Sequence, residues 1–99
     1  MAQFDVYKNP VDAGYLVDCQ TDWLEFTDTR FAVPLLPQGI APKQMTVLNP
    51  IFHIEGEPHV LVTQFAAAIR LRPLGASVAS LSEHRYDILR ALDFLMTGV

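Results

Sequence analysis

The residues of this 99-residue chain that could do chemistry are three histidines, one cysteine and a pair of nearby glutamates. Metal sites need ligands at short fixed spacings, and His53, His59 and His84 show none of them. Glu55 and Glu57 flank a short turn, where carboxylates ordinarily stay hydrated. The chain also lacks a glycine-rich phosphate loop and a G-x-S-x-G nucleophile motif. We therefore expect no catalytic residue, no metal and no cofactor.

Cys19 is the only cysteine, so no disulfide can form within the chain. A lone cysteine is typical of a reducing compartment. It follows Val17 in an apolar stretch, and no neighbour in sequence would lower the pKa of its thiol. We expect Cys19 to be a small buried hydrophobic residue and not a nucleophile.

The charge balance argues against a nucleic-acid-binding protein. The formal net charge is −4, and lysines and arginines form no cluster, whereas phosphate binding needs a basic face. The apolar share of 51% is typical of a folded chain, and its length suits a single domain, residues 1–99. We find neither a secretory signal nor an apolar run long enough for a membrane span, so we expect a cytoplasmic protein.

The first three quarters of the chain show the short alternating runs of β-strands. Two apolar runs, residues 51–54 and 59–62, flank a short loop that carries Gly56 and Pro58, which predicts a hairpin. Pro34 has no backbone donor, so its run suits a sheet edge or a bulge better than a central strand. The proline-rich segment 37–50 is expected to be a loop. The predicted strands are 3–7, 15–19, 30–37, 51–54, 59–62 and, more ambiguously between helix and strand, 68–72.

The C-terminal segment predicts a helix from about Leu81 to Met96. Ser80 and Glu83 form the S-x-x-E pattern of a capping box at its start. Residues of the 3.6-residue repeat form one apolar stripe, widened by Leu89 and Met96. The stripe consists of Ile88, Leu92, Leu95 and Val99.

Three apolar features do not fit a simple core. Trp23 and Leu24 follow a polar run just after a predicted strand, Phe94 lies off the helix stripe, and the chain ends on an apolar helix tip. Trp is common among binding hot spots, although it can also pack at the margin of a core. Together these features indicate contact surfaces, either for a partner protein or for a second copy of the chain.

In this order and spacing, the motifs resemble those of the CcdB toxins. The segment "YLVDCQTD" resembles the family's F-V-D-V-Q-S-D, and "TRFAVPL" resembles its R-x-V-I-P-L strand. "NPIFHI" resembles P-x-x-H-I, and "LSEHRYDILRALDFLMTGV" resembles the closing helix, which ends in Gly and an aliphatic residue. The opening strand "QFDVY" matches as well, so the resemblance spans essentially the whole chain.

The resemblance implies a mainly β fold: a small SH3-like barrel with an antiparallel sheet, a minor β wing and one C-terminal helix, assembled as a homodimer. It implies a toxin of a toxin–antitoxin system, of the kind that maintains plasmids, and no enzymatic activity. Such toxins bind the DNA gyrase A subunit and trap the complex of gyrase with cleaved DNA. A CcdA-like antitoxin neutralises them with a disordered C-terminal segment that orders on binding.

The resemblance also implies which residues face gyrase. They are Trp23, Leu24, Asp93, Met96, Thr97, Gly98 and Val99. The best-known member of the family has Trp at the position of Thr97 and Asn at that of Asp93. Thr97 cannot stack on an arginine as Trp can. Trp23 stands where the family usually has an aliphatic residue, and could supply aromatic surface from the neighbouring loop.

Two alternatives stay open at the level of sequence. Endoribonuclease toxins of the MazF and Kid type share the barrel, and Arg70 and Arg72 would lie on one face of a strand, where they could contact RNA. An acidic chain without a basic run does not favour that function. The other alternative is a non-toxic CcdB homologue that binds antitoxin and not gyrase.

Overall fold

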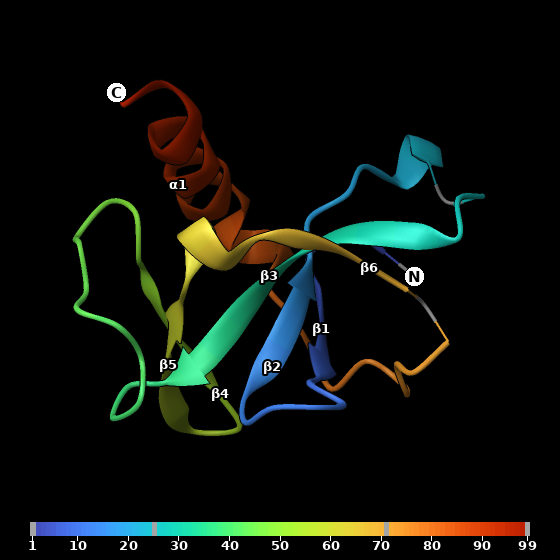
Figure 1. The fold of residues 1–99 in the computed structure, drawn as a ribbon, viewed down its shortest axis with the longest axis horizontal. Coiled ribbons are helices and arrows are strands. Elements are labelled where there is room, and N and C mark those ends of the chain that lie inside the picture. The colour runs from blue at the N-terminus through green and yellow to red at the C-terminus, as the bar shows by residue number, and fades with distance from the viewer. Residues whose placement is uncertain (1, 25, 71, 99) are drawn as a thin grey trace.

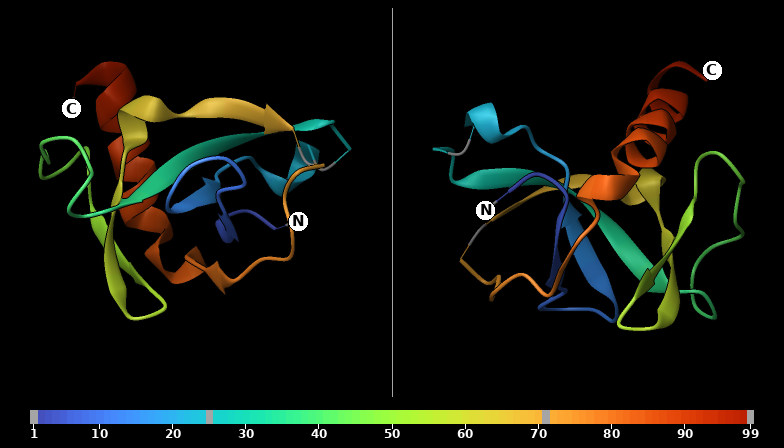
Figure 2. Two further views of the ribbon diagram at one scale, coloured as in Figure 1. Left: turned by 60° about the horizontal axis from the view of Figure 1, so that its bottom comes forward. Right: turned by 180° about the vertical axis from the view of Figure 1, so that it is seen from behind.

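The computed structural model of the chain describes residues 2–24, 26–70 and 72–98. Within these residues, seven strands form one antiparallel sheet in the order β4-β5-β3-β2-β1-β7, with β6 paired to β3. The sheet curls nearly into a barrel, and α1 rises from it at an angle (Figures 1 and 2). The expected mainly β fold with a C-terminal helix is confirmed. The elements are β1 (Asp5–Lys8), β2 (Tyr15–Asp18), η1 (Asp22–Leu24), β3 (Thr29–Pro37), β4 (Ile51–Ile54), β5 (Glu57–Leu61), η2 (Thr63–Phe65), β6 (Ala67–Arg70), β7 (Ala79–Ser80), η3 (Ser82–His84) and α1 (Arg85–Thr97).

The core forms where β1, β2 and β3 lie side by side. Val6 pairs with Val17, which pairs with Val33, and all three are fully buried. β-Branched side chains pack well on such a pleated surface, because their χ1 rotamers are already restricted. Leu35, Leu61, Ile54 and Phe52 extend this cluster toward the β4–β5 hairpin.

The prediction for Pro34 is wrong, because β3 is the central strand of the sheet. The first part of β3 pairs with β6 and its last part with β5, and Pro34 lies between these two registers. The Pro34 carbonyl accepts a hydrogen bond from the Val62 amide at 2.9 Å, so the missing N–H faces the same side. On that side the neighbouring strand β5 has ended, and the chain leaves the sheet through η2. The missing N–H of Pro34 therefore costs no hydrogen bond of the sheet.

The predicted hairpin is confirmed, with a tighter turn than expected. Glu55 and Gly56 alone connect β4 to β5, with φ values of 52° and 83°. Positive φ at both central residues is the mark of a type I′ turn, whose twist matches that of the flanking strands. Pro58, expected in the loop, lies in β5 opposite His53.

The helix begins later than predicted and ends at Thr97, one residue from the predicted Met96. Ser80 lies in β7, and its Oγ accepts from the Ser82 amide at 3.2 Å, so no capping box forms at the start of α1. The helix instead begins at Arg85 after the 3-10 turn η3. Ile88 and Ala91 are fully buried, and Leu89 and Leu92 pack against the core. Farther along, Leu95 is 42% exposed because the last turns project beyond the sheet (Figure 1).

The strand predicted at 68–72 is observed as β6, residues 67–70. Leu71 lies outside the described residues, and Arg72 lies in a turn. Arg70 and Arg72 therefore do not share one strand face, as the ribonuclease alternative would require.

Replacing Gly14 with Ala should destabilise the protein by about 1–3 kcal/mol, because Gly14 has φ +90° and an added Cβ would strike the Leu35 carbonyl oxygen. Urea unfolding followed by circular dichroism measures the change. Gly39→Ala is the matched control, since its Cβ would meet no atom within 4 Å. Equal stability of the two variants would contradict this turn geometry.

Candidate functional site

Trp23 and Leu24 lie on the short turn η1, which projects from one end of the molecule. The Trp23 side chain is 88% exposed and Leu24 is 43% exposed. The alternative that Trp23 packs at the margin of the core is therefore wrong. An indole left in water is costly unless something covers it, so this turn is a candidate contact surface.

Gln20 holds the loop that carries η1. Its Nε2 donates to Thr27 Oγ1 at 2.9 Å and to the Leu24 carbonyl at 3.2 Å. Its Oε1 accepts from the Phe31 amide at 2.9 Å, at the start of β3. The Gln20 side chain thus links both ends of the loop to its tip. These hydrogen bonds hold the loop that carries the exposed Trp23, although the loop has no apolar core beneath it.

A buried ion pair lies beneath this loop. Arg30 and Asp18 are 1% and 2% exposed, and Arg30 Nη2 lies 2.8 Å from Asp18 Oδ2. The same nitrogen donates to the Gln20 carbonyl at 3.2 Å and lies 3.9 Å from Asp22 Oδ1. A charge this deeply buried is tolerated only when it is paired. The pair therefore joins the end of β2 to the start of β3 and to η1.

The other expected contact residues lie at the free end of α1. Asp93, Met96, Thr97 and Gly98 are all exposed, with Met96 at 81%. Thr97 Oγ1 donates to the Asp93 carbonyl at 2.8 Å. Gly98, at φ +76°, ends the helix and donates to the Phe94 carbonyl at 2.9 Å. Such a left-handed glycine is a common helix cap. Val99 lies outside the described residues.

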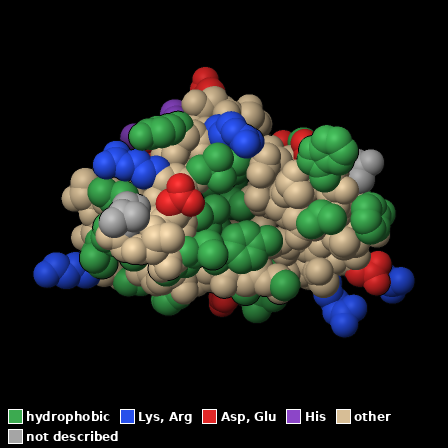
Figure 3. Space-filling model, turned by 90° about the horizontal axis from the view of Figure 1, so that it is seen from above, with side chains coloured by type: hydrophobic (Ala, Val, Ile, Leu, Met, Phe, Trp, Pro, Cys, Tyr) green, Lys and Arg blue, Asp and Glu red, His purple; other side chains and the backbone are tan. Residues whose placement is uncertain are grey.

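The chain does not bring these two groups together. In each view of the fold, η1 and the end of α1 lie on opposite sides of the molecule (Figures 1 and 2). Between them, hydrophobic side chains gather across the face seen in Figure 3.

We name this surface the β6 face and define it by Phe31, Phe65 and Ala68. Phe31 and Phe65 are 39% and 52% exposed, and Phe31 pairs with the exposed Ala68 across β3 and β6. This face is not predictable from the sequence, because alternating apolar residues in a strand do not reveal which side of the sheet is covered. The polar run before Trp23 is the only local signal of the network formed by Gln20 and Arg30.

The side chains that could take part in chemistry, those of the histidines and the cysteine, have structural roles. His59 packs edge-on against Tyr15 at 5.0 Å, and His84 packs against Phe52 at the same distance. Cys19 is buried as predicted, and its pKa is raised to about 12, first by burial and then by the charge of Asp18. Its thiol is therefore not ionised at neutral pH.

Among the described residues, no group of three or more His, Cys, Asp or Glu side chains could hold a metal ion. In the same part of the chain, no helix is long and apolar enough to cross a membrane.

The fold and these surfaces define a small barrel-like β protein that exposes apolar side chains on a loop, on a sheet face and at a helix end. The family model described as CcdB protein matches residues 3–98, nearly the whole chain. The chain therefore belongs to the CcdB family, the toxins of CcdA/CcdB toxin–antitoxin modules. The resemblance found in the motifs is confirmed.

Replacing Gln20 with Ala should free the loop while the barrel stays folded. The Phe31 amide loses its acceptor, and the Leu24 carbonyl loses one donor and keeps only those of Thr27. Amide exchange at Phe31 and in residues 21–24 and 26–28 should therefore speed up about tenfold, the equivalent of roughly 1.4 kcal/mol. Hydrogen exchange by NMR measures this. The exposed Gln38→Ala serves as the control, and unchanged exchange in Gln20→Ala would refute the role of Gln20.

Proposed function

We propose that this protein is a toxin that binds the DNA gyrase A subunit and traps the complex of gyrase with cleaved DNA. It acts in the cytoplasm, and a CcdA-like antitoxin neutralises it with a disordered C-terminal segment. Membership of the CcdB family supports the toxin in general. The observation that carries the gyrase proposal is the exposure of Met96, 81%, at the free end of α1.

The proposed action is binding alone, without bond making by the toxin and without direct contact with nucleic acid. Burying a methionine side chain against a partner contributes about 2 kcal/mol, and a dimeric toxin offers two such ends. The exposed Asp93 carboxylate can meet an arginine of the target through charge. Trp23 supplies the aromatic surface that Thr97 lacks.

The proposed contact surface is complete only in a homodimer. Within one chain η1 and the end of α1 are apart, and the exposed β6 face lies between them (Figure 3). A second copy packed on this face would bury Phe31 and Phe65 and bring its own two ends to the same region. A twofold assembly of this kind matches a twofold target such as the gyrase A dimer.

The deciding experiment incubates the purified protein with gyrase, supercoiled DNA and ATP. Cleaved DNA released by detergent and protease is the expected product. Gyrase altered at the arginine of its A subunit that meets CcdB toxins should resist, and cells that carry it should grow when the chain is expressed. No cleaved DNA with normal gyrase, or specific RNA cleavage that Arg70→Ala abolishes, would overturn the proposal.

Deleting residues 97–99 should abolish binding to the gyrase A subunit and leave a folded dimer. The helix is anchored upstream by the buried Ile88 and Ala91, so its tip is dispensable to the core. Calorimetry with a gyrase A fragment measures binding, and light scattering measures the mass of the dimer. If the shortened protein still traps cleaved DNA, the helix end is not the contact surface.

Replacing Trp23 with Ala should weaken gyrase binding by more than about 1 kcal/mol, the usual threshold for a hot spot, with unfolding unchanged. Val11→Ala is the matched control, because Val11 is 87% exposed and Trp23 88%. Surface plasmon resonance with a gyrase A fragment compares the two. Equal affinities would remove Trp23 from the contact surface.

A further inference from the structure

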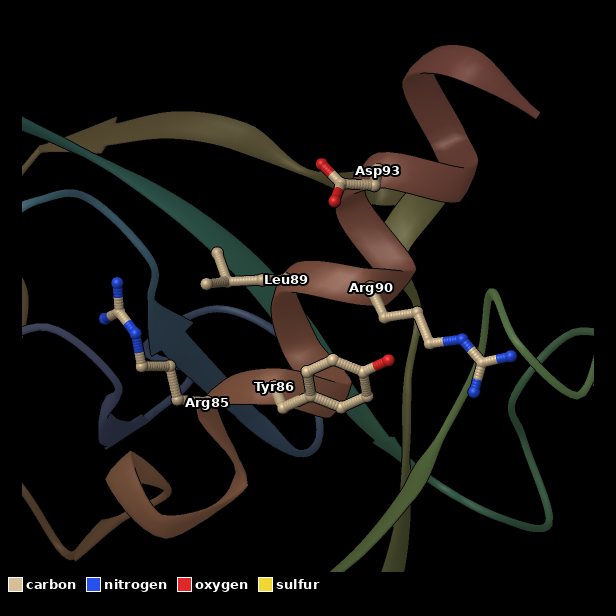
Figure 4. A pocket seen from close by; sticks show the side chains of 5 residues that line it. All are labelled: Arg85, Tyr86, Leu89, Arg90 and Asp93. Carbon is tan, nitrogen blue, oxygen red and sulfur yellow. The ribbon is translucent and has the colours of Figure 1, made fainter. Parts of the chain in front are cut away.

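Arg85, the first residue of α1, is exposed and yet held in one place. Its side chain extends away from those of Tyr86 and Arg90 (Figure 4). Its Nη1 donates to Gln3 Oε1 at 2.9 Å, and its guanidinium lies 5.5 Å from the centroid of the Phe4 ring. A charge-assisted hydrogen bond and a cation–π contact thus join the start of α1 to two adjacent residues near the N-terminus.

Phe4 has a backbone conformation that residues other than glycine rarely adopt, with φ 70°. The Asp5 amide donates to the Ala2 carbonyl at 3.1 Å, so residues 2–5 form a tight turn with Phe4 at its third position. The Phe4 ring is buried, and its carbonyl accepts from the Leu81 amide at 2.9 Å, just before η3. Such a conformation persists only where the surroundings hold it, so this turn is a rigid link between β1 and the start of the helix.

Gln3, in the same turn, contacts the loop that carries Trp23. Its backbone amide donates to Asp22 Oδ1 at 2.8 Å, and its Nε2 donates to the Cys19 carbonyl at 3.1 Å, just after β2. Asp22 is the first residue of η1 and directly precedes Trp23. The hydrogen bonds of Gln3 therefore link the start of α1 to η1.

We propose that Arg85 is a positioning residue for η1, which acts through Gln3 on the orientation of Trp23. Arg85 lies outside the proposed gyrase contact, so it influences that surface only indirectly. The consequence for gyrase binding rests on the proposed function, whereas the link itself does not. A loop that is already held in place loses less conformational freedom when a partner binds it.

A purely stabilising role is the alternative for Arg85. In that case the guanidinium only covers the Phe4 ring, and its loss lowers the stability of the protein without a change at Trp23. A measurement at Trp23 itself therefore separates the two roles, whereas a melting temperature does not.

The test uses the full-length protein labelled with fluorotryptophan. Trp23 is the only tryptophan, so a single fluorine NMR resonance reports on η1. Arg85→Ala should shift this resonance and speed up amide exchange at Trp23 and Leu24 about fivefold, the loss expected for one hydrogen bond. Arg90→Ala is the matched control on the same helix, because Arg90 is exposed and forms no hydrogen bond or ion pair with the residues that the structure describes.

The same two variants in a Gln3→Ala background test the route. If Arg85 acts through Gln3, Arg85→Ala should cause no further shift of the Trp23 resonance in that background. Asp22→Ala breaks the link at η1 and should remove the response in the same way, so it replaces Gln3→Ala should that variant not fold. Three results would overturn the proposal: an unchanged resonance in Arg85→Ala, an equal effect of Arg90→Ala, and a shift that persists without Gln3.

Binding to a gyrase A fragment tests the consequence. Arg85→Ala should weaken it about fivefold although Trp23 and Met96 are intact, and Arg90→Ala should leave it unchanged. Unchanged affinity in Arg85→Ala beside a shifted resonance would refute this consequence. No binding by the unaltered protein would refute the proposed function instead, and the fluorine measurement, from which gyrase is absent, would still decide whether Arg85 positions η1.

Discussion

The buried ion pair between Arg30 and Asp18 is the constraint on which the rest of the molecule depends. It joins the end of β2 to the start of β3, where the central strand begins and the loop carrying η1 departs. Removing one partner would leave an unpaired buried charge, which typically costs about 3–5 kcal/mol. A hydrophobic pair could hold two strands equally well, but it could not also accept and donate the hydrogen bonds that orient the loop.

From this pair a polar network reaches η1 and the start of α1. The Gln3 amide donates to Asp22 in η1 at 2.8 Å, and the Gln3 side chain accepts from Arg85 at the start of α1. Hydrogen bonds, whose geometry is directional, therefore position the loop and add to the apolar packing of Ile88 and Ala91 at the start of the helix. The fold therefore does not depend on packing of the Trp23 and Met96 side chains, so both can stay exposed for a partner.

Several features of the fold could be predicted because local chemistry decides them. Gly56 predicted the hairpin, the apolar surroundings of Cys19 predicted its burial, and the repeat of Ile88 and Leu92 predicted the inner side of α1. The predictions for Pro34 and Ser80 failed because both depend on neighbours distant in sequence. Pro34 is tolerated in the central strand because the neighbouring segment leaves the sheet at that point. Ser80 does not cap the helix because it lies in β7, where it pairs with Asp5 of β1.

The amino-acid sequence by itself determined the family, most of the strands and the C-terminal helix, because motif order and hydrophobic periodicity are properties of the chain alone. The candidate contact residues followed from the resemblance to the family. Only the tertiary structure decided which of those apolar residues stay in water. Leu95 belongs to the same helical stripe as Ile88, yet it is exposed because the sheet ends before the helix does. The separation of η1 from the end of α1, and the apolar face between them, likewise arise from how the sheet curls, which no local pattern encodes.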